Sequence, residues 1–408
     1  MNPVDTWKAA DAAAAAETRE SLVRETAEAL GSSRVEVDLD ALVRNYRRLA
    51  GVVTPAASGV VVKADAYGHG VRRVVLTLEK EGAALAAVAR VEEGVQLRRA
   101  GAELPILVLG FVEPPQLPLF EMHRLVPSVY SAQQLALWRE ALAGPGPVQP
   151  VHLKVDTGMS RLGFSLDDLP AVLDAVRRHP RLELAGFFSH FGDAELDSDR
   201  NPAQEARFDA ALEMLDAAER ERVLVHFANS AAGLHRPQSR FALVRLGIAL
   251  YGVDPAGRID LEPVMSLHAP VCQVREVPAG RAAGYGSRWV ARRPSRLAVV
   301  AVGYGDGYPW RLTNRAEVLL RGRRVPVAGA VSMDLTLLDV TGIEAEVGDE
   351  VVLLGRQGGE TITAVELAGH AGTIPWEITC GLGLRLPRRY MQGGELVGVT
   401  SRHRGSQP

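Results

Sequence analysis

Short apolar runs alternate with longer mixed stretches between residues 59 and 246. Eight runs can be counted: GVVVK (59–63), LAAVA (85–89), ILVLG (106–110), RLVPSV (124–129), VHLKV (151–155), LAGFFS (184–189), VLVHF (223–227) and LVRL (243–246). Continuous apolar runs of this length are typical of buried parallel strands, and the stretches between them are long enough for crossover helices. The pattern therefore predicts an α/β fold, a (β/α)8 barrel with active residues on the loops after the strands.

One of the intervening helices has a readable start and end. Ser131 opens the segment SAQQLALWREAL, and Gln134 follows three residues later, which is the spacing of a capping box. We expect a helix that begins after Ser131 and ends at Gly144-Pro145.

After about residue 266 the strand-like runs become more closely spaced. They lie at 266–277, 295–304, 315–331, 336–340 and 349–355, separated by Gly, Pro and Asp. This texture predicts a second, mostly β domain. The expected organisation is an N-terminal extension at 1–32, either helical or disordered, a barrel at 33–266, a β domain at 267–400 and a disordered polar tail at 401–408.

Composition narrows the classes of partner. The chain has 408 residues and a formal charge of −3, and its charges are interspersed, so no basic face predicts binding to nucleic acid or to a membrane. Cys272 and Cys380 lie far apart without a CxxC motif, which argues against a disulfide framework or a zinc module. The Ala-rich opening is too short and weakly apolar for a secretion signal or membrane span. We expect a cytoplasmic protein with a small-molecule partner and no metal.

Reactive side chains fall at the ends of the predicted strands. They are Lys63 after the first strand, Lys154 near the end of the fifth, His190 after the sixth, His226 and Asn229 after the seventh, and Arg245 in the eighth. Any one of them would ordinarily be a surface residue or a satisfied polar group. A barrel, however, gathers the ends of all its strands at one mouth, and this convergence favours a site.

Lys63 has the chemistry of a covalent catalyst. A lysine held out of water at a strand end can have a lowered pKa, which makes its amine a nucleophile toward an aldehyde and later a base. The glycine-containing turn after it would let Tyr67 reach an anionic group. The segments 229–233 and 245–248 offer hydroxyl and backbone N–H donors where barrel enzymes often bind phosphate. GYGDGY (303–308) is poor evidence for a dinucleotide because no βα unit follows it.

Seven segments resemble the alanine racemase family in type and order. They are VVVKADAYGHG, HLKVDTGMSRLGF, FSHF, ANSAA, VRLGIALYG, AVGYGDGY and SMD, and the similarity covers roughly residues 33 to 392. The resemblance implies a barrel followed by a β domain and bound pyridoxal 5′-phosphate (PLP). It also implies a head-to-tail homodimer in which each active site borrows residues from the partner's β domain. The implied activity interconverts L- and D-alanine and supplies D-alanine for peptidoglycan.

The resemblance also implies roles for individual residues. Lys63 matches the lysine that holds PLP as a Schiff base and is the base on the D-side of the substrate. Tyr285, in AGYGSRW, matches the opposite-face base, which the other subunit delivers. Two bases are needed because a flat carbanion inverts only if a proton donor stands on each side. His190 matches the histidine that bonds this tyrosine, while Arg245 would face the pyridine nitrogen and His226 would support it.

The resemblance also implies residues that bind the anionic groups of the substrate and of PLP. Arg161 resembles the residue that binds the substrate carboxylate and the phenolic oxygen of PLP, and Lys154 matches a lysine that is often carbamylated. The residues expected around the cofactor phosphate are Tyr67, Asn229, Ser230, Gly247 and Ile248. Met333 and Asp334 match a loop of the partner subunit near the substrate carboxylate, although ordinary packing also explains Met333.

One departure from the family leaves the substrate range open. Leu384 stands where the family commonly has a tyrosine, and leucine cannot donate a hydrogen bond to a phosphate oxygen. A racemase of broad specificity, acting on serine, lysine or arginine, is therefore an alternative. A non-catalytic PLP-binding protein is a second alternative, which the β domain and Tyr285 argue against. A metal-assisted aldolase would need more ligands than HFGD (190–193) provides.

Overall fold

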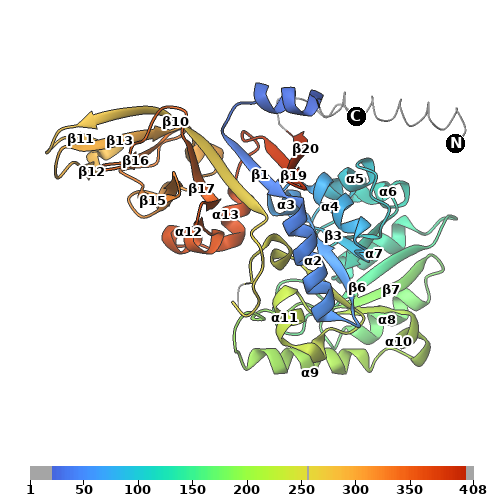
Figure 1. The fold of residues 1–408 in the computed structure, drawn as a ribbon. Coiled ribbons are helices and arrows are strands. Elements are labelled where there is room, and N and C mark those ends of the chain that lie inside the picture. Colours follow the sequence, from blue (N-terminus) through green and yellow to red (C-terminus); the bar gives the residue numbers. More distant parts are fainter. Residues whose placement is uncertain (1–20, 255–256, 401–408) are drawn as a thin grey trace, which may run out of the picture. The chain divides into compact units, whose positions relative to one another are not determined.

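The computed structural model describes residues 21–254 and 257–400, which form two compact units (Figure 1). The first unit contains residues 42–67 and 71–262, and the second contains 21–41, 68–70 and 263–400 among the described residues. Of the expected N-terminal extension, residues 21–29 are helical, while 1–20 lie outside the described residues. The predicted tail at 401–408 also lies outside them.

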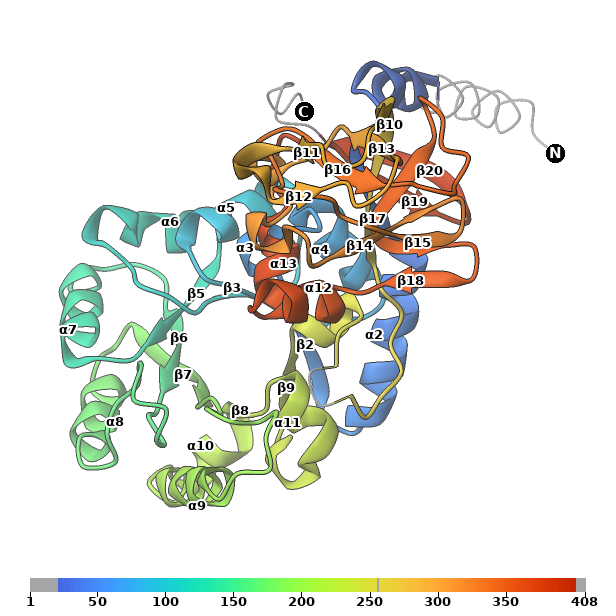
Figure 2. The ribbon, with the colours of Figure 1, turned by 90° about the vertical axis from the view of Figure 1, so that its left-hand side faces the viewer.

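Eight parallel strands form the first unit, and the predicted barrel is confirmed. They are β2 (Ala57–Val61), β3 (Leu85–Val88), β4 (Ile106–Val108), β5 (Leu125–Val129), β6 (Gln149–Lys154), β7 (Leu182–Phe188), β8 (Leu224–His226) and β9 (Leu243–Leu246). Their order is β8-β7-β6-β5-β4-β3-β2-β9. The ring closes between β8 and β9, where Ala242 N–H donates to Val225 O at 3.1 Å. Figure 2 shows this ring with helices outside it.

The helices of this unit cover the strands, and β3 and β4 are buried along their whole length. Strands covered on both faces need apolar side chains on both, which explains the continuous runs in the sequence. The helices are α2 (Leu39–Val53), α4 (Val71–Lys80), α5 (Val91–Arg99), α6 (Leu117–Met122), α7 (Ala132–Ala141), α8 (Leu169–Arg177), α9 (Arg200–Leu212), α10 (Ala217–Arg222) and α11 (Ser230–His235).

Helix α7 begins as predicted but ends early. Gln134 N–H donates to Ser131 Oγ at 3.2 Å, so Ser131 is the N-cap. The expected end at Gly144 was wrong, because α7 stops at Ala141. Ala143 N–H bonds Glu140 O three residues back, at 3.2 Å, which tightens the last turn and terminates the helix.

The second unit is built on a ten-stranded sheet, which confirms the expected β domain. Its strands are β1 (Arg34–Asp38), β10 (Met265–Val277), β13 (Ser295–Val300), β14 (Glu317–Leu320), β15 (Arg323–Pro326), β16 (Thr336–Asp339), β17 (Glu350–Gln357), β18 (Glu360–Ile362), β19 (Arg388–Gln392) and β20 (Glu395–Thr400). Two helices accompany them, α12 (Ala364–Ala371) and α13 (Pro375–Gly381). The first strand, β1, pairs antiparallel with β10 and parallel with β19. The span predicted for the barrel, 33–266, thus contains a strand of the other sheet.

A small hairpin in the second unit carries Tyr285. Strands β11 (Ala282–Ala283) and β12 (Trp289–Val290) flank the single turn η4 (Tyr285–Ser287). Gly284 and Gly286 have φ angles of 73° and 67°, which lie in the left-handed region that glycine adopts without steric cost. The Tyr285 side chain is left 75% exposed.

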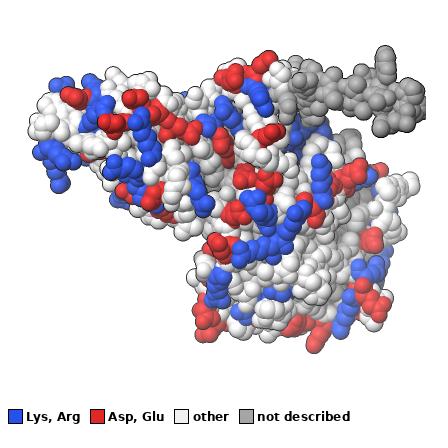
Figure 3. Space-filling view, viewed as in Figure 1, with Lys and Arg blue, Asp and Glu red and all other residues white. Residues whose placement is uncertain are grey.

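The surface bears charges of both signs, and Figure 3 shows Lys and Arg interspersed with Asp and Glu on the face in view. Among residues 21–254 and 257–400, no helix combines the length and apolar character required to cross a bilayer.

Candidate active site

The turn after β2 has an unusual backbone. The strand ends at Val61, two residues before Lys63, and α3 (Lys63–Tyr67) follows. Ala64, Asp65 and Ala66 all lie near φ 53° and ψ 50°, and Tyr67 has a φ of 54°. Four consecutive non-glycine residues are therefore left-handed, each at a cost of about 1–2 kcal/mol. The sequence predicted a tight, glycine-containing turn, and in the structure the left-handed residues begin at Ala64, before the glycines Gly68 and Gly70. Such strain is typical of functional sites.

Two carboxylates hold this turn. Glu93 accepts the Ala64 N–H at 2.6 Å through one oxygen, and its other oxygen accepts the Ala89 N–H at 2.8 Å. Asp65 accepts the Val71 N–H at 2.8 Å. These bonds fix the backbone from which Lys63 projects.

Three residues converge on a cradle beside the turn. The Gly247 N–H donates to Ser230 Oγ at 2.7 Å, and a Cβ placed on Gly247 would lie 3.0 Å from Tyr67 Oη. Asn229 accepts the Ala232 N–H at 2.9 Å, so its side-chain oxygen caps α11 and positions Ser230. Because the Gly247 amide is bonded to Ser230, the hydroxyls of Ser230 and Tyr67 are the polar groups nearest this space. Ile248 begins the adjoining short helix η3 (Ile248–Tyr251).

Lys154 is the last residue of β6 and is almost completely buried. Its Nζ lies 5.8 Å from the centroid of the Phe188 ring. Burial, followed by the positive charges of Arg161 and Arg245, lowers the pKa of the Lys154 amine to about 8. About a tenth of this amine is therefore uncharged at pH 7, and about half at pH 8.

Arg161 lies on the exposed loop between β6 and α8. Asp156 accepts the N–H groups of Gly158 and Ser160 at 2.9 and 3.1 Å, which folds the loop back on itself. At Gly163 a Cβ would lie only 2.4 Å from the Asp156 nitrogen, so glycine is required there. The loop is thus shaped by its own backbone, and Arg161 is near enough to Lys154 and His190 for its charge to lower the pKa of both.

Arg245 is the centre of a buried network. Its guanidinium donates to His226 Nδ1 at 2.7 Å, Phe227 O at 2.8 Å, Ser189 O at 2.9 Å and His190 Nδ1 at 3.0 Å. Burial lowers the pKa of Arg245 to about 9, which still leaves it charged at pH 7. Its Nε–H makes no hydrogen bond to the described part of the chain, so one charged donor remains available.

The two histidines beside Arg245 are neutral. Burial, followed by the charge of Arg245, holds the pKa of His190 and of His226 well below the usual value. The positive charges of Lys154, Arg161 and Lys63 lower the pKa of His190 further. The predicted barrel residues are therefore close together, as their positions at the strand ends indicated.

Sequence reasoning missed several supporting residues. His152 is buried in β6, and its Nδ1 lies 2.9 Å from His226 Nε2. Its signal was present, because residues two apart on a strand share a face and Lys154 follows two positions later. Gln204, on α9, donates to Thr157 Oγ1 at 3.1 Å and to His190 O at 3.2 Å. No local motif indicates Gln204, which lies in the middle of an amphipathic helix.

The residues expected from a partner subunit lie in the second unit. Tyr285 and Met333 are more than half exposed, and so is Leu384, the departure from the family pattern. Asp334 accepts a hydrogen bond from Arg385 at 2.7 Å, and Gly305 N–H bonds Met333 O at 2.8 Å. Met333, Asp334 and Leu384 are thereby held on neighbouring segments.

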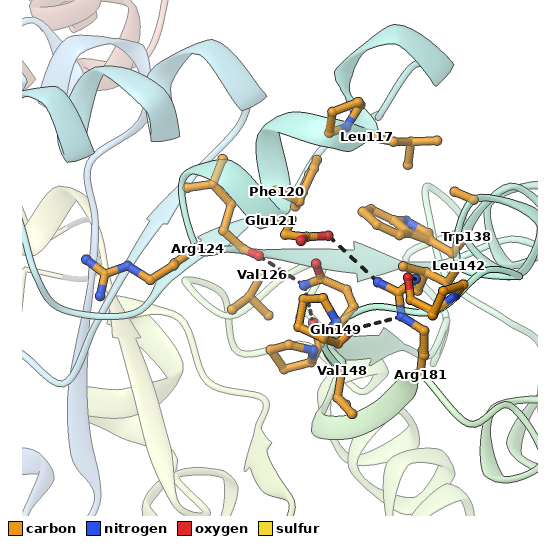
Figure 4. Close-up of a pocket in the computed structure, with 16 residues that line it drawn as sticks. Leu117, Phe120, Glu121, Arg124, Val126, Trp138, Leu142, Val148, Gln149 and Arg181 are labelled. Atoms are coloured by element: carbon orange, nitrogen blue, oxygen red, sulfur yellow. Dashed lines mark hydrogen bonds and ion pairs between the residues drawn. The ribbon is translucent and has the colours of Figure 1, made fainter.

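A separate cavity of about 530 Å³ lies between α6, α7 and the starts of β5 and β6 (Figure 4). Phe120 and Trp138 form part of its apolar wall. Arg181 lies 3.7 Å from Glu121 and donates to the Pro147 carbonyl at 2.9 Å. Arg181 thus secures the loop before β6, and none of the predicted site residues lines this cavity.

Comparison with known proteins agrees with this geometry. The model of the alanine racemase N-terminal domain matches residues 37–255, and that of the alanine racemase C-terminal domain matches residues 264–390. The chain belongs to the alanine racemase family. An alanine racemase of Synechocystis sp. is 41% identical over 365 residues, which cover 87% of this chain and 97% of the relative. The chain is accordingly an isomerase of this family.

Solved alanine racemases have the same fold over most of the chain. The enzyme from Bacillus anthracis with bound L-Ala-P has a TM-score of 0.85 and 34% identity, covering 91% of this chain and 97% of that one. The enzyme from Bartonella henselae with covalently bound pyridoxal phosphate has a TM-score of 0.81 and 32% identity, covering 88% of this chain and all of that one.

The barrel residues fit a cofactor of that kind. PLP carries a phosphate, a phenolic oxygen and a ring nitrogen, and it forms a covalent bond with a lysine amine. The cradle of Tyr67, Ser230 and Gly247 leaves a space that a single Cβ would fill. Lys63, Lys154, Arg161 and Arg245 bring an excess of positive charge near His190, which suits an anionic ligand.

Proposed function

We propose that this protein interconverts L- and D-alanine with PLP by a two-base mechanism. Lys63 and Tyr285 of the partner subunit are the two bases. The observation that carries the proposal is the cluster of Lys63, His190 and Arg245 at the C-terminal ends of the barrel strands. The same cluster is what a covalently held, anionic ring cofactor requires.

The chain's own residues would hold PLP at four points. Lys63 supplies the covalent bond, and the hydroxyls of Tyr67 and Ser230 bind the phosphate, with Asn229 holding Ser230 and with Gly247 and Ile248 at its edge. Arg245 would offer its remaining Nε–H to the ring nitrogen. When bound, PLP withdraws electrons from the substrate α-carbon, which makes its proton removable. An always-charged arginine at the ring nitrogen disfavours protonation there, which moderates this withdrawal and fits racemisation.

Proton transfer on the two faces would be divided between two residues. The left-handed turn fixes the backbone of Lys63, whose amine exchanges the α-proton on the D-side. Tyr285 exchanges it on the opposite face and must give up its own proton to do so. His190 accepts from Arg245 at Nδ1, so its proton is on Nε2, from which it can donate to the tyrosine oxygen.

Arg161 would orient the substrate by binding its carboxylate. Lys154 supports this role through carbamylation, because the uncharged form of an amine is the one that adds to CO₂. The reaction replaces a cation beside Arg161 with an anion that can accept its hydrogen bonds.

A head-to-tail homodimer would bring Tyr285, Met333 and Asp334 to the barrel of the other subunit. The second unit exposes large apolar side chains on connected segments, among them Tyr304, Met333 and Leu384. Exposed apolar groups concentrated in this way are typical of an interface. We also propose that the enzyme acts in the cytoplasm and supplies D-alanine for peptidoglycan.

Chiral chromatography of L-alanine incubated with the PLP-loaded protein tests the activity. We expect D-alanine to accumulate to equal amounts of both enantiomers and Tyr285→Phe to lose racemisation while it keeps the visible absorption of bound PLP. Full activity of Tyr285→Phe would contradict the two-base assignment. A protein that binds PLP but racemises nothing would instead be the non-catalytic alternative.

Leu384 supports a second candidate function, a racemase of broader specificity. Half of the Leu384 surface is exposed, so the surface around it is less polar than it would be with a tyrosine at this position. We expect Leu384→Tyr to change the ratio of the rates with L-alanine and L-serine. An unchanged ratio would show that Leu384 does not set the substrate range, and activity on L-lysine or L-arginine would extend it.

A further inference from the structure

A row of buried side chains links Arg245 to two histidines on other strands of the barrel. Arg245 Nη1 lies 2.7 Å from His226 Nδ1, and His226 Nε2 lies 2.9 Å from His152 Nδ1. The three residues belong to β9, β8 and β6, and all are less than 5% exposed. The row is therefore shielded from water, which otherwise would satisfy any of these groups.

The donors and acceptors in this row can be arranged in only one way. A guanidinium has donors and no acceptor, so His226 Nδ1 must accept from Arg245. His226 is neutral, and its single ring proton is then on Nε2. That proton is donated to His152, whose Nδ1 must accept it. Each histidine in the row consequently carries its proton on Nε2.

The neutrality of the two histidines has a physical cause. Burial, followed by the charge of Arg245, lowers the pKa of His152 to about 3 and that of His226 well below its usual value. A proton added to either ring would place a second positive charge beside a buried guanidinium.

The neighbouring strand makes room for the His152 ring. Gly186, on β7, is the residue in register with His152. A Cβ on Gly186 would come within 2.3 Å of the ring atoms Cγ and Nδ1. A glycine inside a strand weakens it, so its presence here marks a close approach of a neighbouring group. The ring atom Cδ2 would be only 2.5 Å away as well, so the glycine leaves room for the part of the ring around Cγ, which includes Nδ1.

We propose that His152 is a positioning residue that locks His226 in the tautomer able to accept from Arg245. Without an acceptor at His152, the Nε2–H of His226 would be buried and unsatisfied. His226 would then favour the other tautomer, whose Nδ1–H would face the Arg245 donor, and the guanidinium would lose its bond to His226, one of the four that orient it. The effect of this lock on turnover rests on the proposed function, but the tautomer itself does not.

Two substitutions separate the acceptor from the bulk of the side chain. Asn places its Oδ1 close to the position of the histidine Nδ1, so His152→Asn keeps an acceptor. His152→Leu is of similar size and has none. Loss of a hydrogen bond in a buried charged network typically changes a rate or equilibrium by about 10- to 100-fold. We expect kcat to fall by this factor in His152→Leu, with recovery in His152→Asn and little change in KM, since His152 touches no substrate.

Long-range ¹H–¹⁵N spectra of the protein labelled at histidine nitrogens test the tautomer directly, with and without PLP. The His226 signals can be assigned by their loss in His226→Gln. We expect the Nε2–H form of His226 in the wild type and in His152→Asn, and its loss in His152→Leu. A charged or Nδ1-protonated His226 in the wild type would overturn the inference even if His152→Leu does not fold.

The racemase activity of the His152 variants tests the positioning role separately. Equal kcat values for His152→Leu and His152→Asn would overturn the positioning role while leaving the two-base function intact. If instead no variant and no wild-type preparation racemised alanine, the proposed function would fail, yet the spectra would still decide the tautomer.

Discussion

Burial changes the chemistry of the Lys154 amine. Its pKa of about 8 leaves enough neutral amine near pH 8 to add CO₂. We predict a carbamate signal in the ¹³C NMR spectrum of protein equilibrated with ¹³C-bicarbonate. The signal should disappear in Lys154→Arg and persist in Lys80→Arg, which alters an exposed lysine of α4. A signal that survives Lys154→Arg would place the carbamate elsewhere.

Gly247 is the residue on which the proposed phosphate cradle depends most closely. A methyl group there would lie 3.0 Å from Tyr67 Oη. We predict that Gly247→Ala weakens PLP binding at least tenfold, measured by titrating the apoprotein and following visible absorption. Gly51→Ala is the control, because a Cβ at this α2 position meets nothing within 4 Å. Wild-type affinity in Gly247→Ala would show that the phosphate binds elsewhere.

The sequence located most of the barrel residues because a parallel barrel brings the same end of every strand together. To place Lys154, His226 and Arg245 at the site, it was enough to identify the strands that carry them. Tyr285 is different, since its expected partner is another subunit and no pattern within one chain reveals that neighbour. Only the family resemblance indicated its role.

Among the elements, the left-handed turn α3 should respond to an Ala→Gly substitution in the opposite way to an ordinary helix. Glycine should stabilise the turn, whereas it destabilises a helix. Ala64 is exposed and has a φ of 52°, so Ala64→Gly removes steric cost and should raise the free energy of unfolding by up to about 1 kcal/mol. Ala203→Gly, at an exposed position of α9, should lower it by about 1 kcal/mol. Denaturant titration of both variants measures this, and destabilisation by Ala64→Gly would contradict the strain.

The eight barrel strands were predictable because each contains a short run of mostly apolar residues, and strands such as β3 and β4 are buried along their whole length. Strand β1 was not, because its neighbours β10 and β19 are distant in sequence and its RVEVD pattern alternates. Alternation indicates a strand with one buried face but does not say in which sheet. The end of α7 escaped prediction for a local reason, since a single tight turn stopped it before the glycine.

For the whole molecule, the buried histidines predict sensitivity to acid. The folded-state pKa values of His152, His190 and His226 lie below the unfolded value of about 6.5. The unfolded chain therefore binds more protons below pH 6.5, and stability is lost as the pH falls toward about 3. Each histidine contributes a loss of about 1.4 kcal/mol per pH unit within this window.

Unfolding titrations at fixed protein concentration between about pH 4 and pH 7 measure that slope. His152→Asn removes one of the three groups and should reduce the slope by about one proton. A slope that does not change would show that His152 is protonated in the folded state.

We propose that each active site combines Lys63 of one subunit with Tyr285 of the other. Mixing two inactive variants tests whether these residues meet. Lys63→Ala and Tyr285→Phe are unfolded, combined in equal amounts and refolded with PLP, so that mixed dimers form. Half of the dimers are then mixed, and one of their two sites has both native residues, so about a quarter of the wild-type racemase activity should return. If no activity returns although mixed dimers are present, Lys63 and Tyr285 do not meet across subunits.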